Sequence, residues 1–281
     1  MKRRKFEELF FRGLMILATI VVVGSFFLIV GTILDKGLPY MSLDMITKTP
    51  GGGFYIGKSG GVLNAIIGSM YIAGGATLLG LMISIPVAIY INMYMDGKRF
   101  LSNGIRMVFD VLFGIPSIVY GAFGFLIMVY FGIRASLLGG IIAVTLLVIP
   151  ILVRTLDEMI RTVPFELRDA ALSLGTTRWE MAKVVLRQIK PGIFTAILLS
   201  FGRAVGDVAS VLFTAGFSDN IPTSLHQPAA TLPLAIFFQL GSPVEEVQGR
   251  GYASALILTM VVLIITVLSE IFIKKFNKHK L

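Results

Sequence analysis

Two oppositely charged residues lie four positions apart inside an otherwise apolar stretch of the chain. Arg203 and Asp207 would share one face of a helix at this spacing, and either charge buried alone would be costly. They can form a structural pair that holds helices together. Alternatively, Arg203 can face a pore and meet an anion, because a guanidinium is permanently charged and carries several donors. The chemistry of the two side chains leaves both interpretations open.

Groups for covalent chemistry are scarce in this sequence. The chain has no cysteine, which excludes disulfides and thiolate metal sites. It shows no paired carboxylates and no nucleophile beside a base, and its two histidines, His226 and His279, are isolated. We therefore expect no enzyme activity, no cofactor and no bound metal.

The segment from Gly52 to Ser59 formally fits the phosphate-cradling pattern G-x-x-x-x-G-K-[ST]. That pattern needs a preceding strand and a following helix in a soluble βαβ core. Here a glycine-rich segment precedes a long apolar run instead. We reject nucleotide binding and predict a flexible external loop.

The composition shows which solvent surrounds these groups. Hydrophobic residues make up 56% of the 281 residues, and charged residues only 15%. Soluble domains carry about 25% charged residues, so this chain has too little polar surface to cover itself in water. We predict an all-α protein embedded in lipid.

Apolar runs long enough to cross a bilayer require about 20 residues. On this criterion we predict six spans and a short outer helix over 231–240 that does not cross. The first run is too long for the apolar part of a signal peptide, so we expect it to remain as a span. The spans cover about 13–34, 64–95, 105–131, 137–155, 192–216 and 252–273.

The distribution of positive charge orients these spans. Nineteen of the 25 Lys and Arg residues fall on the side that holds both termini, and that side is cytoplasmic by the positive-inside rule. A missed or extra span would reverse half of this assignment. We divide the chain into a basic arm (1–12), a transmembrane domain (13–273) and a basic tail (274–281). Membrane topology explains the net charge of +9 without a nucleic acid partner.

A charged loop over about 156–191 separates the fourth and fifth spans. Leu167, Ala170, Ala171 and Leu174 share a helical face, and Gly175 suits a helix stop. Thr177 and Glu180 match a capping box that starts a second helix. An exposed helix with small residues on one face suits insertion into a groove of a partner.

This loop resembles the EAA loop of ABC importer permeases. The family pattern is Glu-Ala-Ala, three residues and Gly, and Asp169, Ala170, Ala171 and Gly175 occupy those positions, with Asp in place of Glu. The Leu-Pro pair that ends the family pattern is absent. The resemblance implies a coupling helix that docks into an ATPase subunit, and a type I-like permease fold with six transmembrane helices.

A second resemblance concerns the cargo. The segment from Arg203 to Gly216 resembles the Arg-Ala-x-Gly-Glu segment of PstA-type permease subunits of phosphate-specific ABC importers, with Asp207 in place of Glu. Further similar segments are Gly60–Tyr71, Val148–Thr155 and Thr231–Ile236. The resemblance implies a pathway for inorganic phosphate through Arg203 and Asp207. Arg154 is a second candidate, although it can equally be a plain positive-inside charge.

The resemblance also implies partners and a location. They are a homologous second permease subunit, two copies of a cytoplasmic ABC ATPase, an external phosphate-binding protein and the lipid of a bacterial inner membrane. Other cargoes, such as molybdate or sulfate, remain alternatives. An ion-coupled secondary transporter fits less well, because the chain shows no evident repeat. A membrane scaffold without a transport role is a further alternative, which an Arg203→Ala variant with no effect would favour.

The rejected phosphate-cradling pattern yields a direct prediction. Lys58→Ala should leave transport by the assembled complex nearly unchanged, because no nucleotide contacts that lysine. Uptake measurements in cells check this expectation. A complete loss of uptake would contradict an external loop without a nucleotide.

Overall fold

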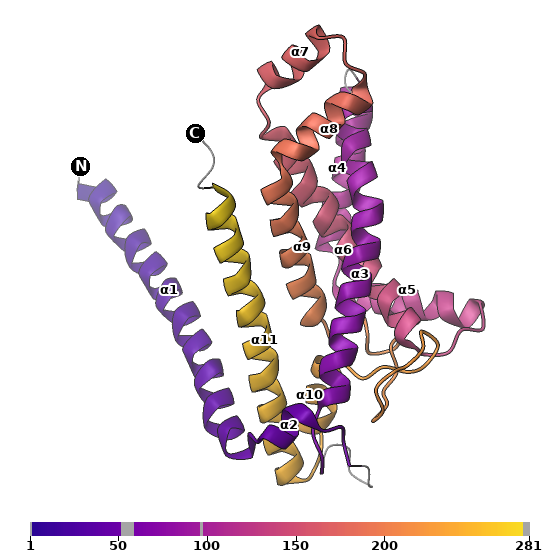
Figure 1. Ribbon diagram of the computed structural model, residues 1–281. Coiled ribbons are helices and arrows are strands. Elements are labelled where there is room, and N and C mark those ends of the chain that lie inside the picture. The colour runs from indigo at the N-terminus through magenta and orange to yellow at the C-terminus, as the bar shows by residue number, and fades with distance from the viewer. Residues whose placement is uncertain (1, 52–58, 96–97, 278–281) are drawn as a thin grey trace.

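The computed structural model describes residues 2–51, 59–95 and 98–277, and Figure 1 shows their arrangement. Those residues are almost entirely helical. The glycine-rich pattern at 52–58 lies outside them. The elements are α1 (Lys2–Gly37), η1 (Leu38–Tyr40), α2 (Leu43–Thr47), α3 (Leu63–Ile89), η2 (Tyr90–Tyr94), α4 (Arg99–Gly114), α5 (Ser117–Tyr130), α6 (Leu137–Arg161), α7 (Phe165–Ser173), α8 (Arg178–Gln188), α9 (Lys190–Val205), α10 (Leu232–Leu240) and α11 (Glu245–Asn277).

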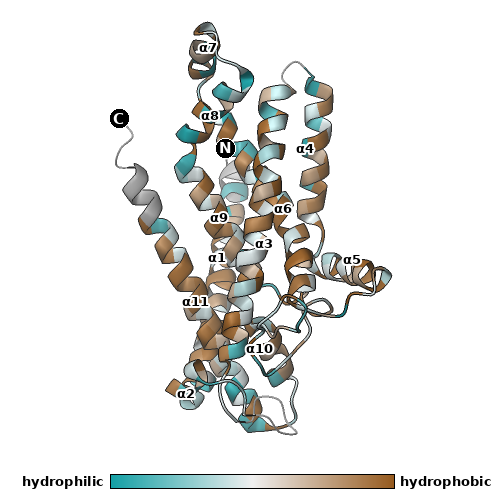
Figure 2. Ribbon diagram, turned by 45° about the vertical axis from the view of Figure 1, so that its right-hand side comes forward, coloured by the Kyte–Doolittle hydropathy of each residue, from teal (hydrophilic) through white to brown (hydrophobic). Residues whose placement is uncertain are grey.

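Four continuous helices of the described chain are long and apolar enough to cross a membrane. They are α1, α3 together with η2, α6 and α11. Two bent pairs, α4 with α5 and α8 with α9, raise the number to six if each pair counts as one span. The predicted all-α membrane architecture is therefore confirmed, with four continuous spans and up to six when the bent pairs are counted. Brown apolar colour follows the long helices in Figure 2, and teal gathers at their ends.

The predicted third span over 105–131 is divided between two helices. The chain bends by 97° between α4 and α5, so α5 points away from the bundle in Figure 1. Ile115 adopts an extended backbone just before Pro116, as expected of a residue whose helical conformation is disfavoured by the following proline. The bend also brings α5 against Ala209 and Ser210. Gly121 of α5 lies so close to their backbone that any side chain at position 121 would overlap it.

The predicted fifth span over 192–216 is also shorter than expected. Helix α9 ends at Val205, and residues 206–216 form turns. Asp207 accepts a hydrogen bond from the backbone N–H of Ser210 at 2.9 Å. A side chain that captures a nearby backbone donor in this way competes with helix continuation.

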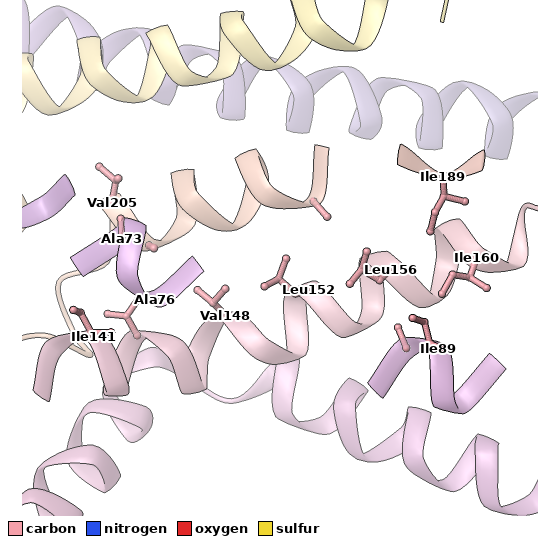
Figure 3. Packing of buried hydrophobic residues seen from close by; sticks show 14 of the residues in the cluster. Ala73, Ala76, Ile89, Ile141, Val148, Leu152, Leu156, Ile160, Ile189 and Val205 are labelled. Carbon is pink, nitrogen blue, oxygen red and sulfur yellow. The ribbon is translucent and has the colours of Figure 1, made fainter. Parts of the chain in front are cut away.

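The core lies between α3 and α6. Small residues of α3, including Ala73, Ala76 and Gly80, allow close approach of α6, whose Val148 and Leu152 are fully buried. Figure 3 shows Val148 and Leu152 on α6, together with Ala73 and Ala76 of α3. In lipid, close packing replaces the hydrophobic effect as the force between helices, and small residues favour it.

Helix α1 lies apart from this core. None of its most apolar window is buried in the described structure, and its side chains face outward along most of its length. Its closest packing is at its end, where Gly37 meets the backbone of Tyr252 in α11 and Lys36 lies over the Tyr252 ring. The arrangement leaves α1 a large apolar surface for lipid or for another subunit.

The segment 218–232, which leads into α10, is held against the start of α3 by hydrogen bonds at both of its ends. Asn64 donates to the carbonyl of Ser218 at 2.7 Å, and the hydroxyl of Ser69 accepts from the backbone N–H of Leu232 at 2.8 Å. The predicted short helix over 231–240 is confirmed as α10, capped by Thr231. Helices α7 and α8 lie at the opposite end of the molecule, the end from which α1 starts and at which α11 finishes (Figure 1).

Gly68 provides a test of this fastening. A side chain at Gly68 would overlap the carbonyl oxygen of Ala230, whereas Gly74 on the same helix has open space around it. Gly68→Ala should lower stability by about 1–3 kcal/mol, as overpacking does. Gly74→Ala, the matched control, should be neutral or slightly stabilising, because alanine favours helix. Thermal unfolding in detergent measures both, and equal unfolding temperatures would contradict the packing.

Candidate functional site

An open cavity of about 540 Å³ lies between α4, α6 and α9. Two arginines from different helices line it, Arg154 of α6 and Arg203 of α9. The remaining walls are mainly apolar, from Leu112, Phe113, Ile115, Leu147, Ile151, Thr155, Glu158 and Leu199. The structure thus brings together two of the three residues predicted for a substrate pathway.

Arg203 stands in the last turn of α9, and about half of its side chain is exposed. Its Nη2 lies 3.5 Å from Oδ1 of Asp207, a separation at the outer edge of hydrogen-bonding range. A cation at this position also interacts favourably with the negative end of the helix dipole. Arg203 therefore has donors that can turn toward the cavity while its charge remains partly compensated.

Asp207 is not on the same helix as Arg203, which corrects the predicted shared helical face. It follows the end of α9, is only 3% exposed, and accepts hydrogen bonds from the backbone N–H and the hydroxyl of Ser210. These hydrogen bonds hold the buried carboxylate in place. Asp207 contacts Arg203 but does not line the cavity itself.

Arg154 is held by two carboxylates. Its Nη1 lies 3.2 Å from Oδ1 of Asp110, and its Nε lies 3.3 Å from Oε1 of Glu158. The guanidinium carbon also lies 5.4 Å from the centre of the Phe113 ring, within the range of a cation–π contact. Arg154 thus connects α6 to α4, and its charge is more fully neutralised than that of Arg203.

A buried polar cluster beside this cavity was not predicted from the sequence. Asp157 of α6 is 7% exposed and pairs with Arg106 of α4 at 2.9 Å, while Asn92 of η2 donates to the same carboxylate at 2.7 Å. A smaller cavity of about 190 Å³ joins this cluster to Arg154 and Glu158. The helical spacing of Val153, Leu156 and Ile160, all buried, would have placed Asp157 on the buried face if the fourth span had been extended to Arg161.

The predicted docking loop forms two short helices at one end of the molecule. Asp169, Ala170 and Gly175 are exposed, whereas Ala171 is the buried residue of α7. The structure therefore groups three of the four predicted coupling residues on an accessible surface. Large apolar side chains are exposed beside them: Phe165, Leu172, Leu174 and Trp179.

The local backbone explains why these helices stop and start where they do. Gly175 has φ of +75°, a conformation that favours glycine and ends α7 as predicted. The capping box of Thr177 and Glu180 is present, and the Thr177 backbone N–H and hydroxyl lower the pKa of Glu180. Pro164 caps α7 just before its first residue, and Pro191 starts α9.

Metal chemistry has no support in the described part of the chain. No group of three or more His, Cys, Asp or Glu side chains lies close enough there to hold an ion. The charged groups around the two cavities instead alternate in sign. Such an arrangement can bind a small anion weakly, or can hold helices together.

Known proteins resemble this chain over most of its length. Residues 84–280 match the family model described as "Binding-protein-dependent transport system inner membrane component". The phosphate transport system permease protein PstA of Haemophilus influenzae is 36% identical over 264 residues, covering 92% of this chain and 90% of that protein. The PstA of Yersinia pestis is 36% identical over 263 residues, covering 92% and 88%.

A solved structure gives the same answer for the fold. The MetNI methionine ABC transporter, in inward-facing conformations, has a chain that matches with a TM-score of 0.60 and 16% identity. The match covers 76% of this chain and 94% of that one. Together with the helices described above, these similarities establish a type I-like permease fold and a multi-pass inner-membrane protein. The chain belongs to the family of binding-protein-dependent transport system inner membrane components, as a relative of the PstA permease proteins.

Proposed function

We propose that this chain forms part of the pathway for inorganic phosphate in an ATP-driven importer. The observation that carries the proposal is the cavity lined by both Arg154 and Arg203. The names of the relatives, phosphate transport system permease proteins, support the choice of cargo.

The chemistry of the cavity suits a phosphate that must pass through. Arginine offers several donors in a fixed geometry that matches phosphate oxygens, and it stays charged. A pathway must also release its cargo, so binding should be weak. Nearby carboxylates partly neutralise the two arginines and so weaken anion binding. Asp207 lies beside Arg203, and Asp110 and Glu158 lie beside Arg154.

The surfaces of the chain suit the partners expected of such an importer. The outward-facing apolar sides of α1, α4 and α5 offer contacts for lipid and for a homologous permease subunit. The exposed residues of α7 form a docking surface for one of two ATPase subunits, which would hydrolyse the ATP. An external phosphate-binding protein would deliver cargo at the opposite end. Both termini would then lie in the cytoplasm, next to the docking loop.

Arg203 offers the most direct test of the pathway. Arg203→Ala should lower phosphate uptake by about tenfold or more, because a hydrogen bond to a charged group is worth about 1.5–3 kcal/mol and about 1.4 kcal/mol corresponds to tenfold. Uptake by Arg203→Lys should be intermediate between that of Arg203→Ala and that of the unchanged protein. Lysine keeps the positive charge but lacks the planar guanidinium that can donate two parallel hydrogen bonds. Uptake of labelled phosphate, with assembly checked by co-purification, measures the effect.

Two further variants separate contact with phosphate from a structural pair. Arg134→Ala removes an exposed arginine outside the cavity and should leave uptake unchanged. If uptake returns when Arg203→Ala is combined with Asp207→Asn, the pair is structural and the pathway role fails. ATP hydrolysis stimulated by phosphate, but not by sulfate or molybdate, would distinguish the cargo.

Gly175 tests the docking surface. Its positive φ strains a β-branched residue, and there is open space around it, so Gly175→Val should disturb only the backbone of the loop. We expect weaker ATPase association and less transport per ATP hydrolysed. Gly175→Asn is the matched control, because asparagine tolerates this conformation. Normal coupling in Gly175→Val would contradict docking at this loop.

A further inference from the structure

We propose that Arg178, the π-helical turn η2 and the Asn92–Arg106–Asp157 cluster link the docking loop to the arginine-lined cavity, so that movement of α8 changes the position of α6. The inference rests on the proposed function, since it concerns how ATPase docking reaches the pathway. It assigns positioning roles to Arg178, Asn92, Arg106 and Asp157, which act through other residues and not by contact with the cargo or the ATPase.

The first step joins the loop to η2. Arg178, the first residue of α8, donates from Nη1 to the backbone carbonyls of Met93 at 3.3 Å and Tyr94 at 3.4 Å. These carbonyls lie at the end of a helix, where the last acceptors have no partner within the helix and a cation is favoured. In Figure 1, α8 lies beside the end of α3 that carries η2. The long side chain therefore ties the docking loop to the backbone of the turn.

The second step lies in the turn itself. Residues Tyr90–Tyr94 form a π-helix directly after α3, and such turns are uncommon and frequent at functional sites. A π-helical turn holds one more residue than an α-helical turn, so its conversion to α would rotate the residues that follow. Coupling between two sites requires an element that can adopt two discrete conformations. The π-helical and α-helical forms of residues 90–94 would be two such conformations.

The third step joins η2 to α6. The Asn92 amide nitrogen donates to Ala88 O at 2.9 Å and to Asp157 Oδ1 at 2.7 Å, and its oxygen accepts from Arg106 at 3.3 Å. Arg106 donates to both carboxylate oxygens of Asp157, at 2.9 and 3.1 Å. The triad is largely buried, so its members hold one another in place.

The last step reaches the cavity. Glu158, which follows Asp157 on α6, pairs with Arg154 at 3.3 Å and lines both cavities. A shift of η2 that pulls on Asp157 must therefore move the carboxylate that holds Arg154. The chain of contacts is continuous from Arg178 to the pathway.

The test uses the assembled complex and exploits the absence of cysteine from this chain. Leu199→Cys places a thiol in the cavity wall, where Leu199 is exposed. The rate at which a maleimide labels this thiol, with and without ATP, measures access to the cavity. Gel separation of the subunits isolates the signal of this chain, in which the introduced residue is then the one cysteine. In the complex without further change, ATP should alter the labelling rate.

Arg178→Met should abolish most of that ATP-dependent change while ATP hydrolysis and ATPase association persist. Phosphate transported per ATP hydrolysed should fall by about 2- to 30-fold, the range expected when one coupling residue is removed. Arg178→Lys should restore part of both. Arg99→Met removes an exposed arginine at the same end and should change neither.

A double-mutant cycle separates the link from independent effects. Arg178→Met and Asn92→Leu should be non-additive, because both interrupt one chain of contacts. Additive losses, or an unchanged labelling response in Arg178→Met, would overturn the link. Loss of ATPase association in Arg178→Met would also overturn it, by placing Arg178 in docking. Failure of the unchanged complex to import phosphate would instead count against the proposed function.

Discussion

The close approach of α3 and α6 is the contact on which the rest of the structure depends. Ala73, Ala76 and Gly80 bring the two backbones near enough for Val148 and Leu152 to be fully buried. In lipid no hydrophobic effect drives helices together, so shape complementarity at this seam must do so. The helices that form the cavity, α4 and α9, both pack on α6, and their positions follow from where α6 is fixed.

Charge inside the bundle is tolerated only in combinations. Asp157 meets Arg106 and Asn92, Arg154 meets Asp110 and Glu158, and each partner removes the cost of leaving the other unpaired. The contacts of Asp157 with Arg106 and Asn92, and of Arg154 with Asp110, also connect different helices, so they serve electrostatics and architecture at once. Arg203 differs, because its contact with Asp207 is long and its partner is already engaged by Ser210. That difference leaves the charge of Arg203 less fully neutralised than that of Arg154, and for this reason the proposed phosphate pathway centres on Arg203.

The sequence predicted what depends on hydropathy and local turn chemistry, including the all-α membrane architecture, the capping box of Thr177 and the stop at Gly175. It did not predict the bend at Pro116, because Pro86 and Pro150 lie within continuous helices and a proline alone does not decide between the two outcomes. The fit of Gly121 against Ser210 supplies the difference, and that contact is tertiary. Helix α9 ends early for a similar reason: apolar residues continue beyond Val205, so hydropathy cannot reveal that Asp207 captures the Ser210 N–H. The roles predicted for Arg203, Asp207, Arg154 and the docking residues remain predictions.

The isolation of α1 has a consequence for how the chain is made. Its packing within the molecule is against α11, through Gly37 and Tyr252, and most of the chain lies between these two residues. Because α1 is synthesised before α11, the contact of Gly37 with Tyr252 can form only after the chain between them has been made. The uninterrupted apolar surface of α1 suits direct contact with lipid until α11 has been synthesised. Insertion of the first helix and assembly of the bundle are thus separate events. The packing of α1 against α11 joins the two ends of the described chain and comes last.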